Sequence, residues 1–290
     1  MASTMSARER TGLVLAAPAF LYMICLFVVP TLLLLVYSFY RSKAFIPIPD
    51  FILENYTRAL NSEGFWRVMW LSLKLGISTA TVSVLASFPV AWYIVYRTNN
   101  NTLLYLIIAS WITSYLVRIY GWRMILGSNG FVNTSLIQLG LIDQPLEFIL
   151  YNPVAVVIAL VHIFMPLTLL MLLSALRDVR PEYLEAARDL GASSVSTLFR
   201  VTIPMIYRGL VSAFMFTLVL ATGDYVAPQV LGGTNGMTVG LLISNQFRAT
   251  GNWPFGAAMA FICFLVFVAI YIVVVLLFRA SGLAPNRRYH

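Results

Sequence analysis

Long apolar runs alternate with short polar stretches along the chain, and this alternation predicts its main elements. A helix needs about 20 apolar residues to cross the hydrocarbon core of a bilayer, and six runs reach that length. We expect spans at residues 13–37, 70–96, 103–126, 153–176, 205–223 and 255–278, with helical character lost between 223 and 228. Because only helices and closed barrels satisfy their backbone groups in lipid, runs of this length indicate an all-α integral membrane protein with six transmembrane helices.

The stretches between the runs divide the chain further. We expect an N-terminal tail and first helix at residues 1–40, an extracytoplasmic loop at 41–66, five more helices at 67–279 and a tail at 280–290. The outer loop contains two prolines and then an amphipathic stretch that predicts an interfacial helix. A cleaved signal peptide is the alternative for the first run, but its apolar region would be shorter, at roughly 7–15 residues.

Composition and charge agree with a membrane protein. The chain is 60% hydrophobic and only 10% charged, whereas roughly 25% of residues are charged in ordinary globular domains. Its formal net charge of +8 comes from basic residues scattered at the ends of apolar runs, a pattern of membrane topology and not of nucleic-acid binding. Arginines gather near both termini, at residue 97 and around 177–200, so the positive-inside rule places these parts in the cytoplasm.

The polar stretch at residues 178–200 is the most distinctive part of the chain. Pro181 suits the first position of a helix, and Glu185 lies in an opening turn, where the helix dipole favours negative charge. Gly191 can take the left-handed conformation that ends a helix. The stretch therefore predicts a helix outside the membrane that leads into the fifth span.

The same stretch resembles the EAA loop of ABC-importer permeases. It contains Glu-Ala-Ala, then a glycine after three intervening residues, then Val-x-Ile-Pro after nine more residues. In that family the loop forms a coupling helix that docks into the cytoplasmic ATPase, which implies a type I importer permease fold. The resemblance assigns coupling to Glu185, Ala186, Ala187, Gly191 and Pro204. An ordinary cytoplasmic loop helix with chance alanines is the alternative interpretation.

The chain has no nucleotide-binding motif of its own. A P-loop requires a glycine directly before its lysine, and neither of the two lysines, Lys43 and Lys74, follows a glycine. The two cysteines, Cys25 and Cys263, lie in apolar runs, so no metal site is predicted. We therefore expect a transport subunit and not an enzyme, with no cofactor bound by this chain and with ATP and Mg²⁺ used by a partner ATPase.

A second group of candidate residues lies inside the spans. In the third run four side chains recur at helical spacing and share one face of a continuous helix: Trp111, Tyr115, Arg118 and Trp122. In the fifth run the only acidic residue is Asp224, which precedes Tyr225 and lies between Gly223 and Pro228, two residues that favour a helix break. Ionisable groups at such depths are costly and usually face an interior or a wet cavity.

Two interpretations are open for these residues. Either Arg118 and Asp224 line a translocation path with Tyr225 and the aromatic side chains of the third run, or they form a structural ion pair between two helices. We expect the two charges to be paired at rest, with the aromatic rings contacting a cationic solute. His162, in the fourth run, is predicted to be a hydrogen-bonded packing residue.

Several further segments resemble the spermidine/putrescine-type permeases: residues 118–121 with 126–127, 223–228 with 231–233, and 253–258. This resemblance implies a heterodimer with a second permease, two ATPase subunits and an extracytoplasmic solute-binding protein, in the bacterial inner membrane. The implied solute is a polyamine or related amine; an opine, an amino-acid derivative or another solute is the alternative. A secondary transporter or a channel would instead show internal repeats or a filter motif, and neither is evident in the sequence.

Cysteine labelling tests the predicted orientation. In a background in which Cys25 and Cys263 are replaced by serine, Ser194→Cys should react with a membrane-impermeant reagent only from the cytoplasmic side. Gln144→Cys should react only from outside, because it lies in the loop between the third and fourth spans. Labelling of the Ser194→Cys variant in intact cells would contradict the orientation.

Overall fold

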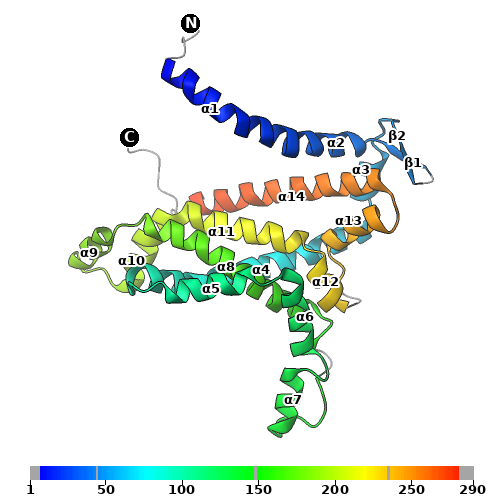
Figure 1. Ribbon diagram of the computed structural model, residues 1–290. Coiled ribbons are helices and arrows are strands. Elements are labelled where there is room, and N and C mark those ends of the chain that lie inside the picture. Colours follow the sequence, from blue (N-terminus) through cyan, green and yellow to red (C-terminus); the bar gives the residue numbers. More distant parts are fainter. Residues whose placement is uncertain (1–6, 44, 147–148, 234–235, 281–290) are drawn as a thin grey trace. The chain divides into compact units, whose positions relative to one another are not determined.

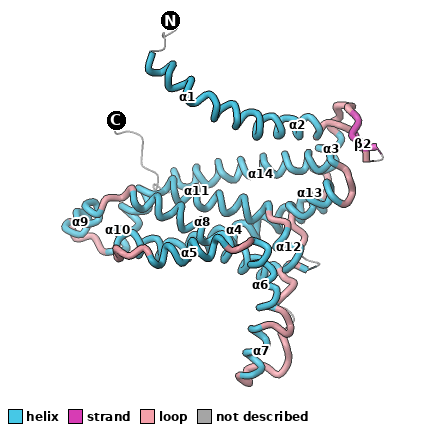
Figure 2. Tube along the Cα trace, in the orientation of Figure 1, coloured by secondary structure: helices cyan, strands magenta, loops and turns pink. Residues whose placement is uncertain are grey.

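The computed structural model describes residues 7–43, 45–146, 149–233 and 236–280, with side chains from residue 15 onward (Figures 1 and 2). Within these residues the regular secondary structure is helical apart from one two-stranded hairpin. It forms two compact units, Met1–Ser62 with Ile243–Ile262, and Glu63–Leu242 with Cys263–His290. The predicted cytoplasmic tail lies, except for its first residue, outside the described residues.

The first unit begins with the predicted first span. It is helical throughout, as α1 (Ala7–Met23), a π-helical turn (Ile24–Val28) and α2 (Val29–Tyr37). The apolar side chains of this span are exposed, as expected for a helix that faces lipid.

The outer loop of the first unit is more ordered than the sequence predicted. Strands β1 (Arg41–Lys43) and β2 (Ile46–Ile48) form an antiparallel hairpin, followed by α3 (Glu54–Leu60), the predicted interfacial helix. Buried Asn55 of α3 holds the segment between α2 and the hairpin by donating to the carbonyls of Ser38 (2.9 Å) and Tyr40 (2.8 Å). The hairpin was missed because a strand pair of this length has too few residues to show an alternating pattern.

The core of the second unit is formed by α4 (Glu63–Tyr96), α8 (Pro153–Arg177) and α11 (Ile203–Gly223), which pack against one another. These three helices confirm the predicted second, fourth and fifth spans. Helix α4 begins before the predicted start at residue 70. Two further helices, α13 (Val239–Arg248) and α14 (Trp253–Ala280, the predicted sixth span), contribute residues to both units.

Small and hydroxyl side chains allow the three core helices to approach closely. Ser72, Thr79, Ser83 and Ser87 recur along one face of α4 and are fully buried. On the same face, a Cβ added to Gly76 would lie 2.0 Å from the Thr222 hydroxyl oxygen of α11. Because the backbones approach closely at this glycine, the small hydroxyl side chains of α4 are buried in the helix interface.

The predicted third span is not one helix. It consists of α5 (Thr102–Ile112) and α6 (Tyr115–Leu126), and the chain bends by 91° between α5 and the segment Tyr115–Gln138. Thr113 and Ser114 have extended backbones, with ψ of 139° and 135°. Hydroxyl side chains compete for backbone hydrogen bonds and favour helix ends, which explains why the break falls at this pair. Within the described residues five helices are long and apolar enough to span a membrane, or six if the bent pair is one span.

Helices that the sequence places on opposite sides of the membrane lie at opposite ends of the second unit. Figure 1 shows α9 (Pro181–Asp189) and α10 (Ser194–Thr197) at one end, and α6, α7 (Phe131–Gln138) and α12 (Val226–Leu231) at the other. The arrangement separates the predicted coupling segment from the candidate path residues, as a transport subunit requires.

Candidate transport path and coupling segment

The candidate path is centred on a break in the fifth span. Helix α11 ends at Gly223, Asp224 is extended with ψ of 135°, and the chain resumes as α12 at Val226. The predicted loss of helical character is therefore confirmed, although it is shorter than expected and Pro228 lies inside α12. Proline is tolerated there because the N–H groups in the first turn of a helix have no hydrogen-bond acceptor within the helix.

Two donors hold the Asp224 carboxylate. Its Oδ1 atom accepts a hydrogen bond of 2.8 Å from the Ala227 backbone N–H, which is one of the free donors at the start of α12. Its Oδ2 atom accepts a hydrogen bond from the Tyr115 hydroxyl of α6. Asp224 thus links the break in the fifth span to the first residue after the break in the third.

The segment before α13 braces the same break from another side. The Thr238 hydroxyl donates to the Asp224 carbonyl at 3.0 Å, and the Val239 N–H donates to the Ser72 hydroxyl of α4 at 2.6 Å. A Cβ added to Gly240 would lie 2.2 Å from the carbonyl oxygen of Gly223, so the two backbones are in contact. These bracing residues were missed, because hydroxyl residues and glycines in a loop carry no pattern that identifies their partners.

Arg118 and Trp122 both contact α8. The Arg118 Nη1 donates to the Ile163 carbonyl at 3.3 Å, and the Trp122 indole N–H donates to the Nδ1 atom of His162 at 3.1 Å. Pro166 lies further along α8, three residues after Ile163 and four residues after His162. Because proline has no N–H, the carbonyl of His162 lacks its usual hydrogen bond within the helix. Arg118 therefore donates to the carbonyl next to the one that Pro166 leaves free. His162 is hydrogen-bonded, as predicted, but its side chain is exposed and not packed in the core.

The structure corrects two expectations about these residues. Among the described residues no ion pair joins Arg118 to Asp224, since the carboxylate is held by Tyr115 and Ala227 instead. Trp111 does not share a helix face with Tyr115, because the break at residues 113–114 places it on α5. The continuous-helix spacing assumed from the sequence fails at that break.

The remaining path candidates lie around the two breaks. Tyr115, Arg118 and Trp122 stay together on α6, and Tyr225 follows Asp224 with its side chain exposed. Among the described residues no group of three or more His, Cys, Asp or Glu side chains is placed to hold a metal ion.

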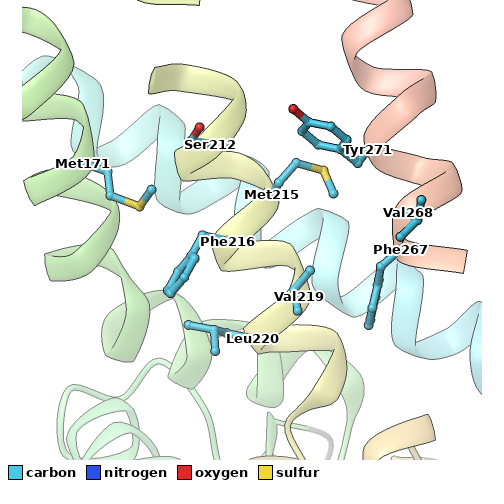
Figure 3. A pocket seen from close by; sticks show the side chains of 9 residues that line it. All are labelled: Met171, Ser212, Met215, Phe216, Val219, Leu220, Phe267, Val268 and Tyr271. Carbon is cyan, nitrogen blue, oxygen red and sulfur yellow. The ribbon is translucent and has the colours of Figure 1, made fainter. Parts of the chain in front are cut away.

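An apolar pocket of about 430 Å³ lies between α8, α11 and α14. Figure 3 shows Phe267 and Tyr271 of α14 on one side and Met215 and Val219 of α11 on the other. The polar groups of its lining side chains are the hydroxyls of Ser212 and Tyr271, and none is charged. It therefore lacks the groups that would bind a charged solute and suits an apolar chain or side chain.

The coupling segment has the predicted local structure. Pro181 is the first residue of α9, buried Leu184 anchors the helix, and Gly191 is left-handed with φ of +81°. The Tyr96 hydroxyl of α4 donates to the carbonyls of Leu176 (2.9 Å) and Val179 (3.1 Å) just before α9. These contacts fix the position at which the segment leaves the core.

The surface of the coupling segment is unusually apolar for a loop. Leu190 is 88% exposed, and Val195 is 66% exposed. Between them the turn at Gly191 satisfies the end of α9, with the N–H of Ala192 donating to the Ala187 carbonyl at 3.0 Å. Ala186 is exposed and Ala187 is partly exposed, so the helix presents small side chains beside large apolar ones.

These features agree with the comparisons with known proteins. The model of a family described as "binding-protein-dependent transport system inner membrane component" matches residues 1–282. The chain belongs to this family. It is a permease subunit of an ABC importer.

Relatives and solved structures support the assignment. The spermidine/putrescine transport system permease protein PotB of Haemophilus influenzae is 34% identical over 245 residues, covering 83% of this chain and 85% of PotB. PotB of Escherichia coli is 34% identical over 210 residues, covering 72% and 76% of the two chains. A chain of a bacterial alginate ABC transporter, solved with an alginate pentasaccharide-bound periplasmic protein, matches with a TM-score of 0.74 at 15% identity, covering 96% and 97%. The fold is that of a type I importer permease.

A pair of glycines tests whether the contact at the break matters. Gly240→Ala should destabilise the permease by about 1–3 kcal/mol, because its Cβ would overlap backbone atoms that cannot move aside. Gly223→Ala, on the other side of the same contact, should change stability little, since its Cβ would meet nothing within 4 Å. The measurements are the thermal midpoint of the purified complex and its solute uptake. Equal effects of the two changes would show that the break is not braced in this way.

Proposed function

We propose that this permease forms half of a transmembrane path for an organic amine, most simply a polyamine such as spermidine or putrescine. The observation that carries the proposal is the 34% identity to spermidine/putrescine permeases over most of both chains. The site adds chemical support, because Asp224 places a carboxylate at a break within a span. An importer of an opine or an amino-acid derivative is the second candidate, favoured by the positively charged Arg118 near the same break.

The proposed assembly contains a second permease, two ATPase subunits and an extracytoplasmic binding protein, in a bacterial inner membrane. ATP and Mg²⁺ are used by the ATPase subunits, because neither lysine of this chain lies in a P-loop. Both termini and the coupling segment face the cytoplasm, in agreement with the arginine distribution.

The ATPase binds the surface formed by α9 and the turn that follows it. Ala186 and Ala187 allow close approach, Glu185 faces outward beside them, and Leu190 offers an apolar side chain that is 88% exposed. Gly191 orients this turn, and Pro204 lies in the first turn of α11, so a displacement of the surface passes directly into the fifth span. Burial of these exposed apolar groups on a partner is favourable by about 25 cal/mol per Å².

Uptake by a reconstituted importer tests the solute class. Liposomes containing this permease, its second permease and the ATPases should accumulate radiolabelled spermidine or putrescine when the binding protein and internal ATP are supplied. An opine and a neutral diol of the same length serve as comparison solutes. Accumulation of the opine without either polyamine would contradict the polyamine assignment and favour the second candidate.

A substitution at Ala187 tests the coupling surface. Ala187→Lys should lower uptake at least about tenfold and abolish its coupling to ATP hydrolysis, because a long charged side chain would have to be desolvated in the interface. Ala187→Ser is the matched control and should retain uptake, since it adds only a hydroxyl. The two variants should be present in the membrane in equal amounts, because α9 lies outside the spans. Normal coupled uptake by the Ala187→Lys variant would argue against this docking surface.

A further inference from the structure

We propose that Asp224 is the residue that binds the solute's ammonium group, and that the Tyr115 hydroxyl occupies its place while the path is empty. The inference rests on the proposed function, because it takes the solute to be an amine. It extends that proposal by naming the binding atom and the group that competes for it.

The two oxygens of Asp224 have different kinds of partner. Oδ1 is held by the backbone N–H of Ala227, which belongs to α12 and cannot leave without unwinding that helix. Oδ2 is held by the hydroxyl of Tyr115, a side chain that can rotate away. The partner of Oδ1 is therefore fixed by the fold, whereas the partner of Oδ2 can be replaced by another donor.

The site also lacks a cation of its own. Among the described residues no lysine or arginine forms an ion pair with Asp224. The nearby Arg118 instead donates to the Ile163 carbonyl, and its Nε atom has no hydrogen-bond partner within the described chain. A carboxylate in a span without a counter-charge is costly. A neutral hydroxyl reduces that cost without neutralising the charge, which leaves room for one positive group.

An ammonium group is a better partner for this carboxylate than a phenol. It brings a full opposite charge as well as an N–H donor, and such charge-assisted bonds are roughly twice as strong as neutral ones. The aromatic rings of Tyr115 and Trp122 lie on α6, on the same side of the break, where they can contact the methylene groups and the charge of an alkyl amine.

Exchange at Oδ2 has a structural consequence. Tyr115 is the first residue of α6, directly after the bend in the third span, whereas Asp224 directly follows α11. When an ammonium displaces the hydroxyl, the hydrogen bond between these two broken spans is lost, whereas the apolar packing of α6 against α12 stays. Solute binding thereby removes the polar link between α6 and the α11–α12 break, which couples occupancy to the contacts between the spans.

The test measures the affinity of the assembled permease–ATPase complex for radiolabelled putrescine, in nanodiscs and without the binding protein. Asp224→Asn should weaken binding at least about tenfold, because the charge-assisted bond is removed. Tyr115→Phe should strengthen binding several-fold, because the diamine no longer has to displace the hydroxyl. Tyr120→Phe, an exposed tyrosine on the same helix, is the control and should bind as the wild type does.

The outcomes separate this inference from the proposed function. If the wild-type complex binds and transports putrescine but both Asp224→Asn and Tyr115→Phe keep its affinity within twofold, the ammonium site is wrong and the polyamine importer stands. If the wild-type complex neither binds putrescine nor accumulates a polyamine in the uptake assay with the binding protein, both proposals fail. Should the Asp224→Asn variant not assemble, the comparison of Tyr115→Phe with Tyr120→Phe decides alone, and equal affinities overturn the inference.

Discussion

A break in a membrane span has to be satisfied by protein, and the break at Asp224 organises one end of the second unit. Lipid offers no hydrogen bonds, so a free backbone group or carboxylate there costs several kcal/mol. Three parts of the chain meet this requirement: α6 through Tyr115, the start of α12 through Ala227, and the residue before α13 through Thr238. Ser72 of α4 holds the start of α13 in turn, by accepting a hydrogen bond from Val239. The same constraint accounts for Gly76 and Gly240, because α4 and α13 can support the break only where their backbones come close to it.

The fourth span contains a proline, and the carbonyls that precede it receive side-chain donors, Arg118 among them. Around Pro166 the carbonyls of α8 receive side-chain donors from three places: Arg118 bonds Ile163, Thr168 bonds Phe164 and Ser87 bonds Met165. An arginine within a span therefore need not be a counter-ion for an acid. It can serve a helix backbone that has lost part of its own ladder, which is why charge alone was a poor guide to its partner.

The sequence predicted much of the fold because each long apolar run had only one stable conformation in lipid. The spans at α4, α8, α11 and α14, the left-handed Gly191 and the break after Gly223 all follow from local chemistry. The bend at Thr113 and Ser114 was missed because two hydroxyl residues do not interrupt an apolar run strongly. The Arg118–Asp224 pair was wrong for a related reason, since the sequence places both charges at one depth but does not give the direction of either side chain. Tyr115 was identified as a path residue, yet its bond to Asp224 depends on the bend that the sequence did not reveal.

The coupling segment and the candidate solute site are joined by one uninterrupted stretch of helix. From Ser194 to Gly223 the chain is helical for 30 residues, through α10, a π-helical turn (Leu198–Thr202) and α11. At 1.5 Å per residue this stretch is about 45 Å long, enough to cross the whole bilayer. Its α11 part packs against α4 and α8, so the coupling segment has a continuous helical connection to the far end of the span. Asp224 follows directly after that end, and its side chain accepts a hydrogen bond from Tyr115. A surface of small and apolar side chains and a single carboxylate therefore lie at the two ends of one helical stretch.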